Sequence, residues 1–197
     1  MFWHWGNALQ GNDNTEWSDA ANLALQKLAL RQISPTRHAM PVGLIGPREA
    51  TAEQLRAARH LGYTLADAGM TILCGGKGGV MEAAAFGAAR AGGIVVGLLP
   101  EDDASGANPF LTVALPTGMG ITRNALIARA SLCLIAIGGG LGTLSEIALG
   151  LQWNKAVFTL LDAPQVSGAE AFQDIDALVT RVANWLLSAQ QTQAIAG

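Results

Sequence analysis

The stretch from residue 132 to residue 153 constrains the fold more than any other part of the chain. An uninterrupted apolar run, residues 132–137, leads directly into a glycine-rich segment, GGGLGT at 138–143. Apolar side chains at helical spacing begin at once, at Leu144, Ile147, Ala148 and Leu151. A buried strand, a glycine turn and a helix therefore follow one another, which is the local pattern of a parallel sheet covered by helices.

This junction favours the binding of an anion. The backbone N–H groups at the start of a helix lack partners and point outward, and a phosphate is their typical ligand. The hydroxyl of Thr143 is expected to cap the helix or to bind the phosphate. Glu146 lies one helical turn further on, so both side chains can face the ligand. The segment matches neither a P-loop nor the G-x-G-x-x-G fingerprint, so a plain tight turn is the alternative interpretation.

Strand and helix patterns alternate along the rest of the chain. Continuously apolar strands are expected at 42–45, 70–74, 94–99, 112–115, 132–137 and 156–161. Helices are expected at 19–33, 52–68, 80–91, 121–130, 143–153 and 169–188. This alternation predicts an α/β fold with a doubly wound, mostly parallel, Rossmann-like sheet in a single domain.

We assign residues 41–190 to this Rossmann-like domain and residues 1–40 to an N-terminal arm and helix. Trp3, Trp5 and Trp17 stand among polar residues, which is not how a domain core begins. We therefore expect an extended arm that packs on a neighbouring subunit.

Ligands of doubly wound folds bind at the carboxyl ends of the strands, near the point where the strand order reverses. Glycine-rich loops follow several of the expected strands, so we predict that these loops gather into one phosphate-binding site. The candidate ligand-binding residues are Gly46, Gly75, Gly76, Lys77, Gly78, Gly79, Gly118, Gly120, Arg123, Asn124, Gly138, Gly139, Gly140, Gly142, Thr143 and Glu146.

The polar candidates each have two interpretations. Lys77 is a phosphate partner or an exposed loop lysine, and Arg123 turns toward a nucleotide or into solvent. Asn124 forms a hydrogen bond with a sugar hydroxyl or braces a loop. Arg129 is expected in a structural ion pair. Glu146 contacts the ligand or complements the helix dipole.

Composition excludes several classes of function. The net charge of −3 gives no basic field for nucleic acid. No apolar run approaches the roughly 18 residues of a membrane span, and the N-terminus lacks the pattern of a secretory signal. Cys74 and Cys133 fall in apolar runs and are expected to be buried thiols of a cytoplasmic protein. The three histidines show no metal-site spacing.

Residues 138–146, GGGLGTLSE, are similar to the P-G-G-x-G-T-x-x-E signature of the LOG family. These cytokinin nucleoside monophosphate phosphoribohydrolases were once called lysine decarboxylase-like. Arg123 has the spacing of that family's catalytic arginine, and Glu146 matches its catalytic glutamate. Residues 75–81 look like the family's upstream glycine loop.

Two departures point to a sister family. Gly138 replaces the proline of the signature, and the basic H-E-R-K motif around the arginine is ITRN at 121–124. Residues 43–50, 118–124 and 138–149 resemble the molybdenum cofactor carrier proteins instead, and the likeness covers about residues 41–160.

The resemblance implies a binding protein for a phosphate-bearing, nucleotide-like ligand, with molybdenum cofactor as the bound ligand and no other cofactor required. The alternative is a LOG-like enzyme that cleaves the N-glycosidic bond of AMP or a cytokinin riboside monophosphate, with Arg123 and Glu146 as catalytic residues. Both families also imply a homodimer or tetramer, for which residues 80–91 and 143–153 and the tryptophan arm are the expected interface. Binding of single-stranded nucleic acid is disfavoured by the acidic balance.

Overall fold

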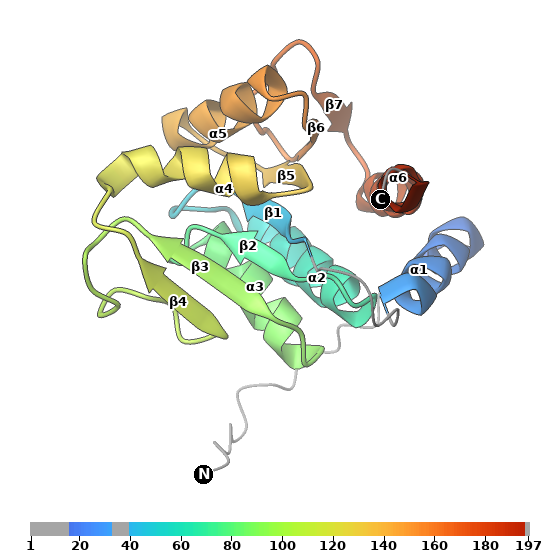
Figure 1. Ribbon diagram of the computed structural model, residues 1–197, viewed down its shortest axis with the longest axis horizontal. Coiled ribbons are helices and arrows are strands. Elements are labelled where there is room, and N and C mark those ends of the chain that lie inside the picture. Colours follow the sequence, from blue (N-terminus) through green and yellow to red (C-terminus); the bar gives the residue numbers. More distant parts are fainter. Residues whose placement is uncertain (1–15, 33–39, 196–197) are drawn as a thin grey trace.

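In a computed structural model, which describes residues 16–32 and 40–195, the centre of the molecule is a seven-stranded sheet (Figure 1). Every neighbouring pair of strands is parallel, in the order β4-β3-β2-β1-β5-β6-β7. The strands are β1 (Val42–Ile45), β2 (Ile72–Cys74), β3 (Val95–Leu99), β4 (Val113–Pro116), β5 (Cys133–Ile137), β6 (Ala156–Leu160) and β7 (Glu170–Phe172).

Helices cover both faces of the sheet, which confirms the predicted doubly wound, Rossmann-like fold. The helices are α1 (Asp19–Gln32), α2 (Ala52–Asp67), α3 (Val80–Arg90), α4 (Asn124–Ala130), α5 (Leu141–Gln152), α6 (Ile175–Ile195) and the short 3-10 helix η1 (Gly120–Arg123). One core lies between the sheet and α1, α2, α3 and α6, and the other lies between the sheet and α4 and α5.

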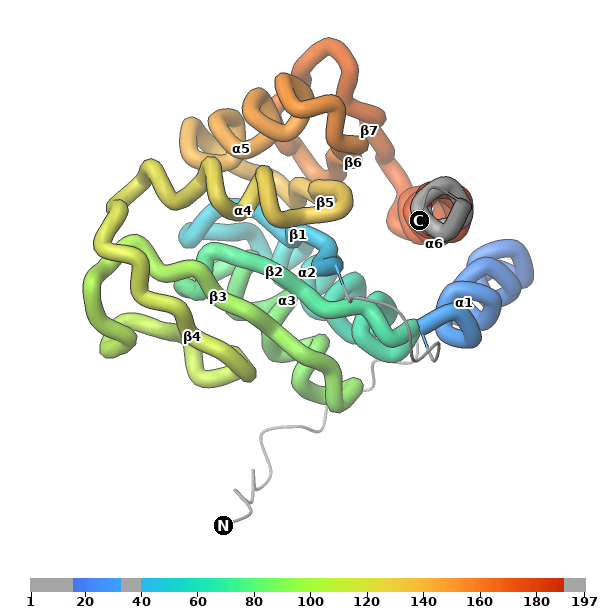
Figure 2. The backbone as a smooth tube through the Cα atoms, viewed as in Figure 1, coloured from blue at the N-terminus to red at the C-terminus, as the bar shows by residue number. Residues whose placement is uncertain are grey.

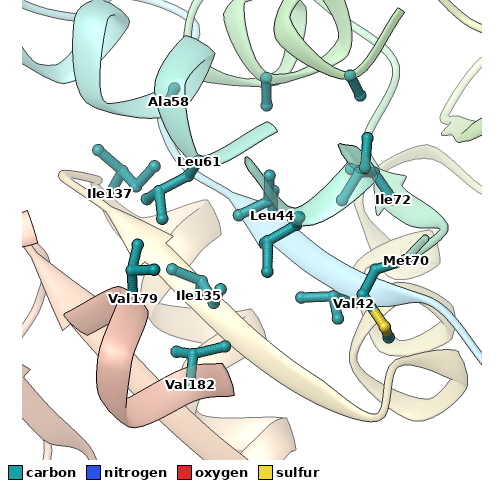
Figure 3. Close-up of a cluster of buried hydrophobic side chains, with 14 of the residues drawn as sticks. Val42, Leu44, Ala58, Leu61, Met70, Ile72, Ile135, Ile137, Val179 and Val182 are labelled. Atoms are coloured by element: carbon teal, nitrogen blue, oxygen red, sulfur yellow. The ribbon is translucent and has the colours of Figure 1, made fainter. Parts of the chain in front are cut away.

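The continuous apolar strands explain this double cover, because successive side chains enter opposite cores. On β5, Ile135 and Ile137 belong to the core on the α2 side, whereas Leu134 belongs to the core on the α5 side. Figure 3 shows the first core, in which residues of β1, β2 and β5 face Leu61 of α2 and Val179 of α6. Burial on both faces thus requires apolar side chains at successive positions of the central strands.

The path of the chain places a crevice in the middle of the sheet. Strands β1 to β4 are added successively toward one edge, and the chain then returns so that β5 pairs with β1. Gly43 pairs with Leu134 and Ile45 with Ala136. The loops after β1 and β5 therefore leave the sheet in opposite directions from adjacent strand ends, which is the usual ligand position of such folds.

The prediction of one helix over residues 169–188 is wrong at its start. Glu170–Phe172 instead form the edge strand β7, which pairs with β6 through Phe158 and Glu170, and α6 begins only at Ile175. The carboxylate of Asp174 accepts a hydrogen bond from the backbone of Ala177 and so marks the helix start. A strand of three residues carries too little periodicity to be seen in the sequence.

The N-terminal helix is held against α6 (Figure 2). The backbone N–H of Ser18 donates to the carboxylate of Asp176, and the guanidinium of Arg31 donates to the carbonyl of Leu187. Helix α1 buries Ala21, Ala24 and Leu28, whereas Leu23 and Leu30 are exposed. Of the predicted tryptophan arm, residues 1–15 lie outside the described residues, and Trp17 packs edge-on against His60.

Both cysteines are buried free thiols, as expected. Burial raises the pKa of Cys74 to about 11 and that of Cys133 to about 12, so neither is a nucleophile near neutral pH. Within the described ranges, no helix has both the length and the apolarity needed to cross a membrane.

Helices α2 and α3 pack with unusually close backbones, because glycines stand where they cross. A Cβ atom on Gly87 would collide with the carbonyl of Arg59, and one on Gly62 would collide with the carbonyl of Ala84. Helix α3 must keep this position, since its N-terminus carries the loop that follows β2.

We expect Gly87→Val to destabilise the fold by about 3 kcal/mol or more. The added carbons have no space, and the backbone of α2 would have to shift to make room for them. Ala89→Val, on the exposed side of the same helix, serves as the control and should cost only about 0.5 kcal/mol through helix propensity. Guanidinium-induced unfolding measures both. Equal losses in the two variants would contradict the close crossing.

Candidate functional site

A cavity of about 380 Å³ opens at the carboxyl ends of β1, β2 and β5, at the reversal of strand order. Its walls come from the loop after β1, the start of the loop after β2, η1 with the first residue of α4, and the first turns of α5. The lining residues are Ile45, Gly46, Pro47, Arg48, Gly75, Met81, Pro100, Ile121, Arg123, Asn124, Gly140, Gly142, Thr143 and Glu146.

Two buried ionisable side chains, those of Arg123 and Glu146, form the polar part of this cavity. Arg123 is 7% exposed and Glu146 is 6% exposed. Nη1 of Arg123 lies 3.7 Å from Oε1 of Glu146, and Nη2 donates to the carbonyl of Gly75 at 3.4 Å. The Nε of the same guanidinium is buried and has no hydrogen-bond partner among the described residues. A buried donor without a partner is costly, and an anion in the cavity is a group that could satisfy it.

Asn124 fastens η1 and α4 to the start of α5. Its Nδ2 donates to the carbonyl of Gly142 at 3.3 Å and to the hydroxyl of Ser145 at 3.1 Å. Ser145 in turn donates to the same carbonyl at 2.6 Å, and the Oδ1 of Asn124 accepts from Arg123. Every polar atom of the Asn124 amide therefore has a partner within the protein. Of the two roles expected for Asn124, bracing a loop is the one that describes this geometry.

The first turn of α5 borders the cavity, which Gly140, Gly142 and Thr143 line. The helix begins at Leu141 with Gly140 as its N-cap, and no side chain caps it. Of the two roles expected for Thr143, capping is wrong, because Thr143 is the third residue of the helix; it lies in the cavity wall, 4% exposed, and its role as a phosphate ligand stays a prediction. The uncapped N-terminus leaves backbone donors and a positive dipole end for a ligand.

The glycine turn before α5 is required by its surroundings. Gly138 has a φ of +59°, and a Cβ there would collide with the amide of Gln54. That amide is fixed on both sides, because Gln54 completes the capping box of α2 with Thr51 and donates to the carbonyl of Leu161 at 3.1 Å. The capping box thus positions the turn that carries α5.

The loop after β2 contributes less to the cavity than the sequence suggested. Gly75 lines it, and a Cβ there would meet Nη2 of Arg123 at 2.5 Å. Lys77 instead forms an ion pair of 2.7 Å with Glu101, which lowers the pKa of that carboxyl. The loop 100–110 is tied to the same segment, since the backbone of Asn108 donates to the carbonyl of Gly76.

Of the sixteen predicted residues, half line the cavity and half do not. Those that line it are Gly46, Gly75, Arg123, Asn124, Gly140, Gly142, Thr143 and Glu146. Those that stand outside it are Gly76, Lys77, Gly78, Gly79, Gly118, Gly120, Gly138 and Gly139. Several of the second group have positive φ values or closely packed backbones and shape the loops. Arg129 lies outside too, stacked on Trp153 at 5.4 Å rather than in the expected ion pair.

Sequence reasoning missed Arg48, a cation at the rim of the cavity, and the apolar wall residues. Arg48 follows β1 by three residues, at the same sheet edge as the glycine loops. This position just after the end of a strand is the sequence signal that could have identified Arg48 as a site residue. The missed apolar residues are Ile45, Pro47, Met81, Pro100 and Ile121.

Burial sets the protonation of the pair. It raises the pKa of Glu146 to about 8, against the opposing attraction of Arg123. It also lowers the pKa of Arg123, which Glu146 opposes. A desolvated carboxyl beside a guanidinium can hold or release a proton near neutral pH. The described residues include no cluster of three or more side chains placed to bind a metal ion.

Together the fold and the site define a class of protein, a Rossmann-like domain with a small-molecule-sized cavity at its strand ends. A family model for LDcluster4, the SLOG cluster4 family, matches residues 39–186. The chain therefore belongs to the SLOG cluster4 family. An uncharacterised protein of Archaeoglobus fulgidus is 40% identical over 134 residues, which cover 68% of this chain and 88% of that relative.

Two similar solved structures are molybdenum cofactor proteins. The molybdenum cofactor binding protein of the phototrophic bacterium Rippkaea orientalis is 30% identical with a TM-score of 0.72. The molybdenum cofactor carrier protein of Chlamydomonas reinhardtii is 29% identical with a TM-score of 0.69. Each match covers 77% of this chain and 99% of the other. The resemblance to the carrier proteins is thereby confirmed, and the likeness supports a ligand-binding role.

The Glu146 carboxyl predicts a pH dependence of stability. Its pKa is raised on folding from 4.5 to about 8, so between these values the folded chain holds a proton that the unfolded chain releases. The free energy of unfolding should fall as pH rises through this window, by at most about 1.4 kcal/mol per unit. Glu146→Gln should remove this slope, whereas Glu49→Gln, at an exposed carboxylate, should keep it.

Urea unfolding at intervals between pH 5 and pH 8 measures the three slopes. If the free energy of unfolding changes with pH equally in the wild type and in Glu146→Gln, the carboxyl titrates alike in the folded and unfolded states.

Proposed function

We propose that this protein binds molybdenum cofactor, a pterin with one phosphate, and acts as its carrier. The observation that carries the proposal is the cavity in which the uncapped start of α5 and the buried guanidinium of Arg123 meet. The likeness to two molybdenum cofactor proteins over almost their whole length supports the choice of ligand.

The cavity offers suitable contacts for both ends of such a molecule. The backbone donors at the start of α5, near Gly142, suit the phosphate, and Arg48 at the rim adds a positive charge. Met81 and Pro47 give an apolar wall against which a flat ring system can pack. The volume of about 380 Å³ lies at the small end for ligand sites, so it favours a mononucleotide-sized molecule over a dinucleotide.

One observation keeps a hydrolase as the second candidate. Glu146 is buried beside Arg123 in the cavity wall, in the relative positions that the LOG resemblance implies for catalysis. In such an enzyme, ionised Glu146 would stabilise the positive ribosyl centre and Arg123 would orient the substrate. The raised pKa of Glu146 works against this role at neutral pH, because the protonated carboxyl carries no charge. We favour the carrier, because Gly138 and residues 121–124 depart from the LOG motif and the two similar solved structures are molybdenum cofactor proteins.

The direct test is mass spectrometry of the small molecules released from the protein after expression in a host that makes molybdopterin. A carrier should release the pterin, or its oxidation product, in a stoichiometric amount. Release of a purine nucleotide alone would favour the second candidate instead.

Gly142→Val is expected to lower the pterin content at least about tenfold while the fold is retained. A Cβ on Gly142 has its nearest neighbour, Nδ2 of Asn124, at 3.8 Å, so a larger side chain extends into the cavity and not into the core. Ala148→Val, on the exposed side of the same helix, is the control and should keep the wild-type content. An unchanged pterin content in Gly142→Val would refute a phosphate site at this helix start.

Glu146→Gln separates the carrier from the hydrolase. For a carrier, the wild type should release no free base or ribose 5-phosphate from AMP or a cytokinin riboside monophosphate. For a hydrolase, the wild type should turn over, and the variant should lose at least about a hundredfold in rate because the charge is gone. Chromatography of the free base gives the answer. Robust turnover that depends on Glu146 would reverse our preference.

A further inference from the structure

A second cavity, of about 510 Å³, lies between the loop after β1 and the neighbouring helices α2 and α3 (Figure 1). We call it the α2–α3 cavity. Its lining residues are Arg48, Glu49, Ala50, Leu55, Arg59, Gly79, Glu82, Ala83, Phe86 and Phe110. Among the described residues, only Arg48 also lines the cavity at the strand ends, so the two cavities are separate sites.

Backbone contacts fix the wall between the two cavities. The N–H of Val80 donates to the carbonyl of Pro47 at 3.1 Å. Gly79 has a φ of +69°, and a Cβ there would collide with the carbonyl of Arg48. The start of α3 therefore packs directly on the loop after β1. Gly79, which the sequence predicts as a ligand residue, lines the α2–α3 cavity.

Two phenylalanines give the α2–α3 cavity an aromatic surface. The rings of Phe86 and Phe110 meet edge to face, with their centroids 5.0 Å apart and their planes at 79°. The guanidinium carbon of Arg59 lies 4.9 Å from the centre of the Phe86 ring. Both phenylalanines are half-buried, so part of each ring is accessible to a ligand that adds a further aromatic contact.

Four charged side chains, two of each sign, line the same cavity. They are Arg48, Arg59, Glu49 and Glu82. Within residues 16–32 and 40–195, none of the four forms an ion pair, and the Nε of Arg59 is a buried donor without a hydrogen-bond partner. The formal charges of the cavity therefore cancel, while guanidinium groups and carboxylates are both available to a ligand.

We infer that the α2–α3 cavity binds a free α-amino acid with an aromatic side chain. An anion alone would face two carboxylates, and a cation alone would face two guanidinium groups, so a zwitterion is the ligand that matches both. Its ring packs against Phe86 and Phe110. The volume of the cavity lies within the usual range for small-molecule sites.

The half-buried members of the charged set hold the two ends of the amino acid. The guanidinium of Arg59, whose Nε needs an acceptor, binds the carboxylate. Glu82 accepts from the ammonium, since it is less exposed than Glu49. Glu82 and Phe86 are four residues apart on α3, so the ammonium site and the aromatic surface lie on one face of that helix.

Isothermal titration calorimetry with L-phenylalanine tests the inference. One molecule should bind per chain, with a dissociation constant below about 1 mM. Hydrocinnamate lacks the ammonium and phenethylamine lacks the carboxylate, so each should bind at least about tenfold more weakly. Equal affinities for the three compounds would overturn the inference, and so would the absence of phenylalanine binding up to about 10 mM.

Two variants test the assigned contacts. Glu82→Gln should weaken phenylalanine binding at least about tenfold, because the amide carries no charge to match the ammonium. Glu53→Gln, at an exposed carboxylate of α2 outside the cavity, is the control and should keep the wild-type affinity. Phe86→Ala should also lose at least about tenfold through the missing ring contact. Thermal unfolding shows whether each variant keeps its fold.

A folded Glu82→Gln or Phe86→Ala protein with the wild-type affinity would overturn the inference. Gly142→Val, which obstructs the cavity at the strand ends, should bind phenylalanine as the wild type does. Loss of phenylalanine binding in Gly142→Val would place the amino acid in that cavity and overturn the inference as well. These measurements use no pterin, so their outcome is independent of the proposed carrier function.

Discussion

The parallel pairing of β1 with β5 is the contact on which the rest of the structure depends. It joins two halves of the chain that are built outward in opposite directions, and it sets their glycine turns side by side. Gly138 then enters the left-handed region against Gln54, and the turn delivers an uncapped helix start to the crevice. The strand order thus determines where the cavity lies, and the side chains that line it determine its shape and polarity.

The buried Arg123–Glu146 pair gives the cavity its chemical character. A guanidinium and a carboxyl removed from water usually lower stability unless further partners satisfy them. Here one guanidinium nitrogen has the carbonyl of Gly75, another faces Glu146, and the Nε has no partner among the described residues. A site that is incomplete in this way is better suited to hold an anion than to stabilise the empty protein. This is the physical basis for preferring a binding role.

The sequence was most informative where local pattern and tertiary structure agree. Apolar runs such as the one before Gly138 predicted the strands and their shared sheet edge, because burial on two faces leaves a continuous signal. Strand β7 could not be predicted from the sequence, because its three residues form a strand only through their pairing with β6. The orientation of Lys77 toward Glu101 and the place of Arg48 at the rim depend on how separate loops meet, which no local pattern encodes.

Arg123 and Asn124 are neighbours in the chain, yet they hold opposite sides of the crevice. The first reaches the carbonyl of Gly75 after β2, and the second holds Gly142 and Ser145 at the start of α5. One peptide unit therefore acts as a cross-brace between the two halves of the sheet. A single inserted residue between them would turn one side chain away by a fraction of a helical turn and release one wall. Related chains should accordingly tolerate changes of length before η1 or after α4, but not within this dipeptide.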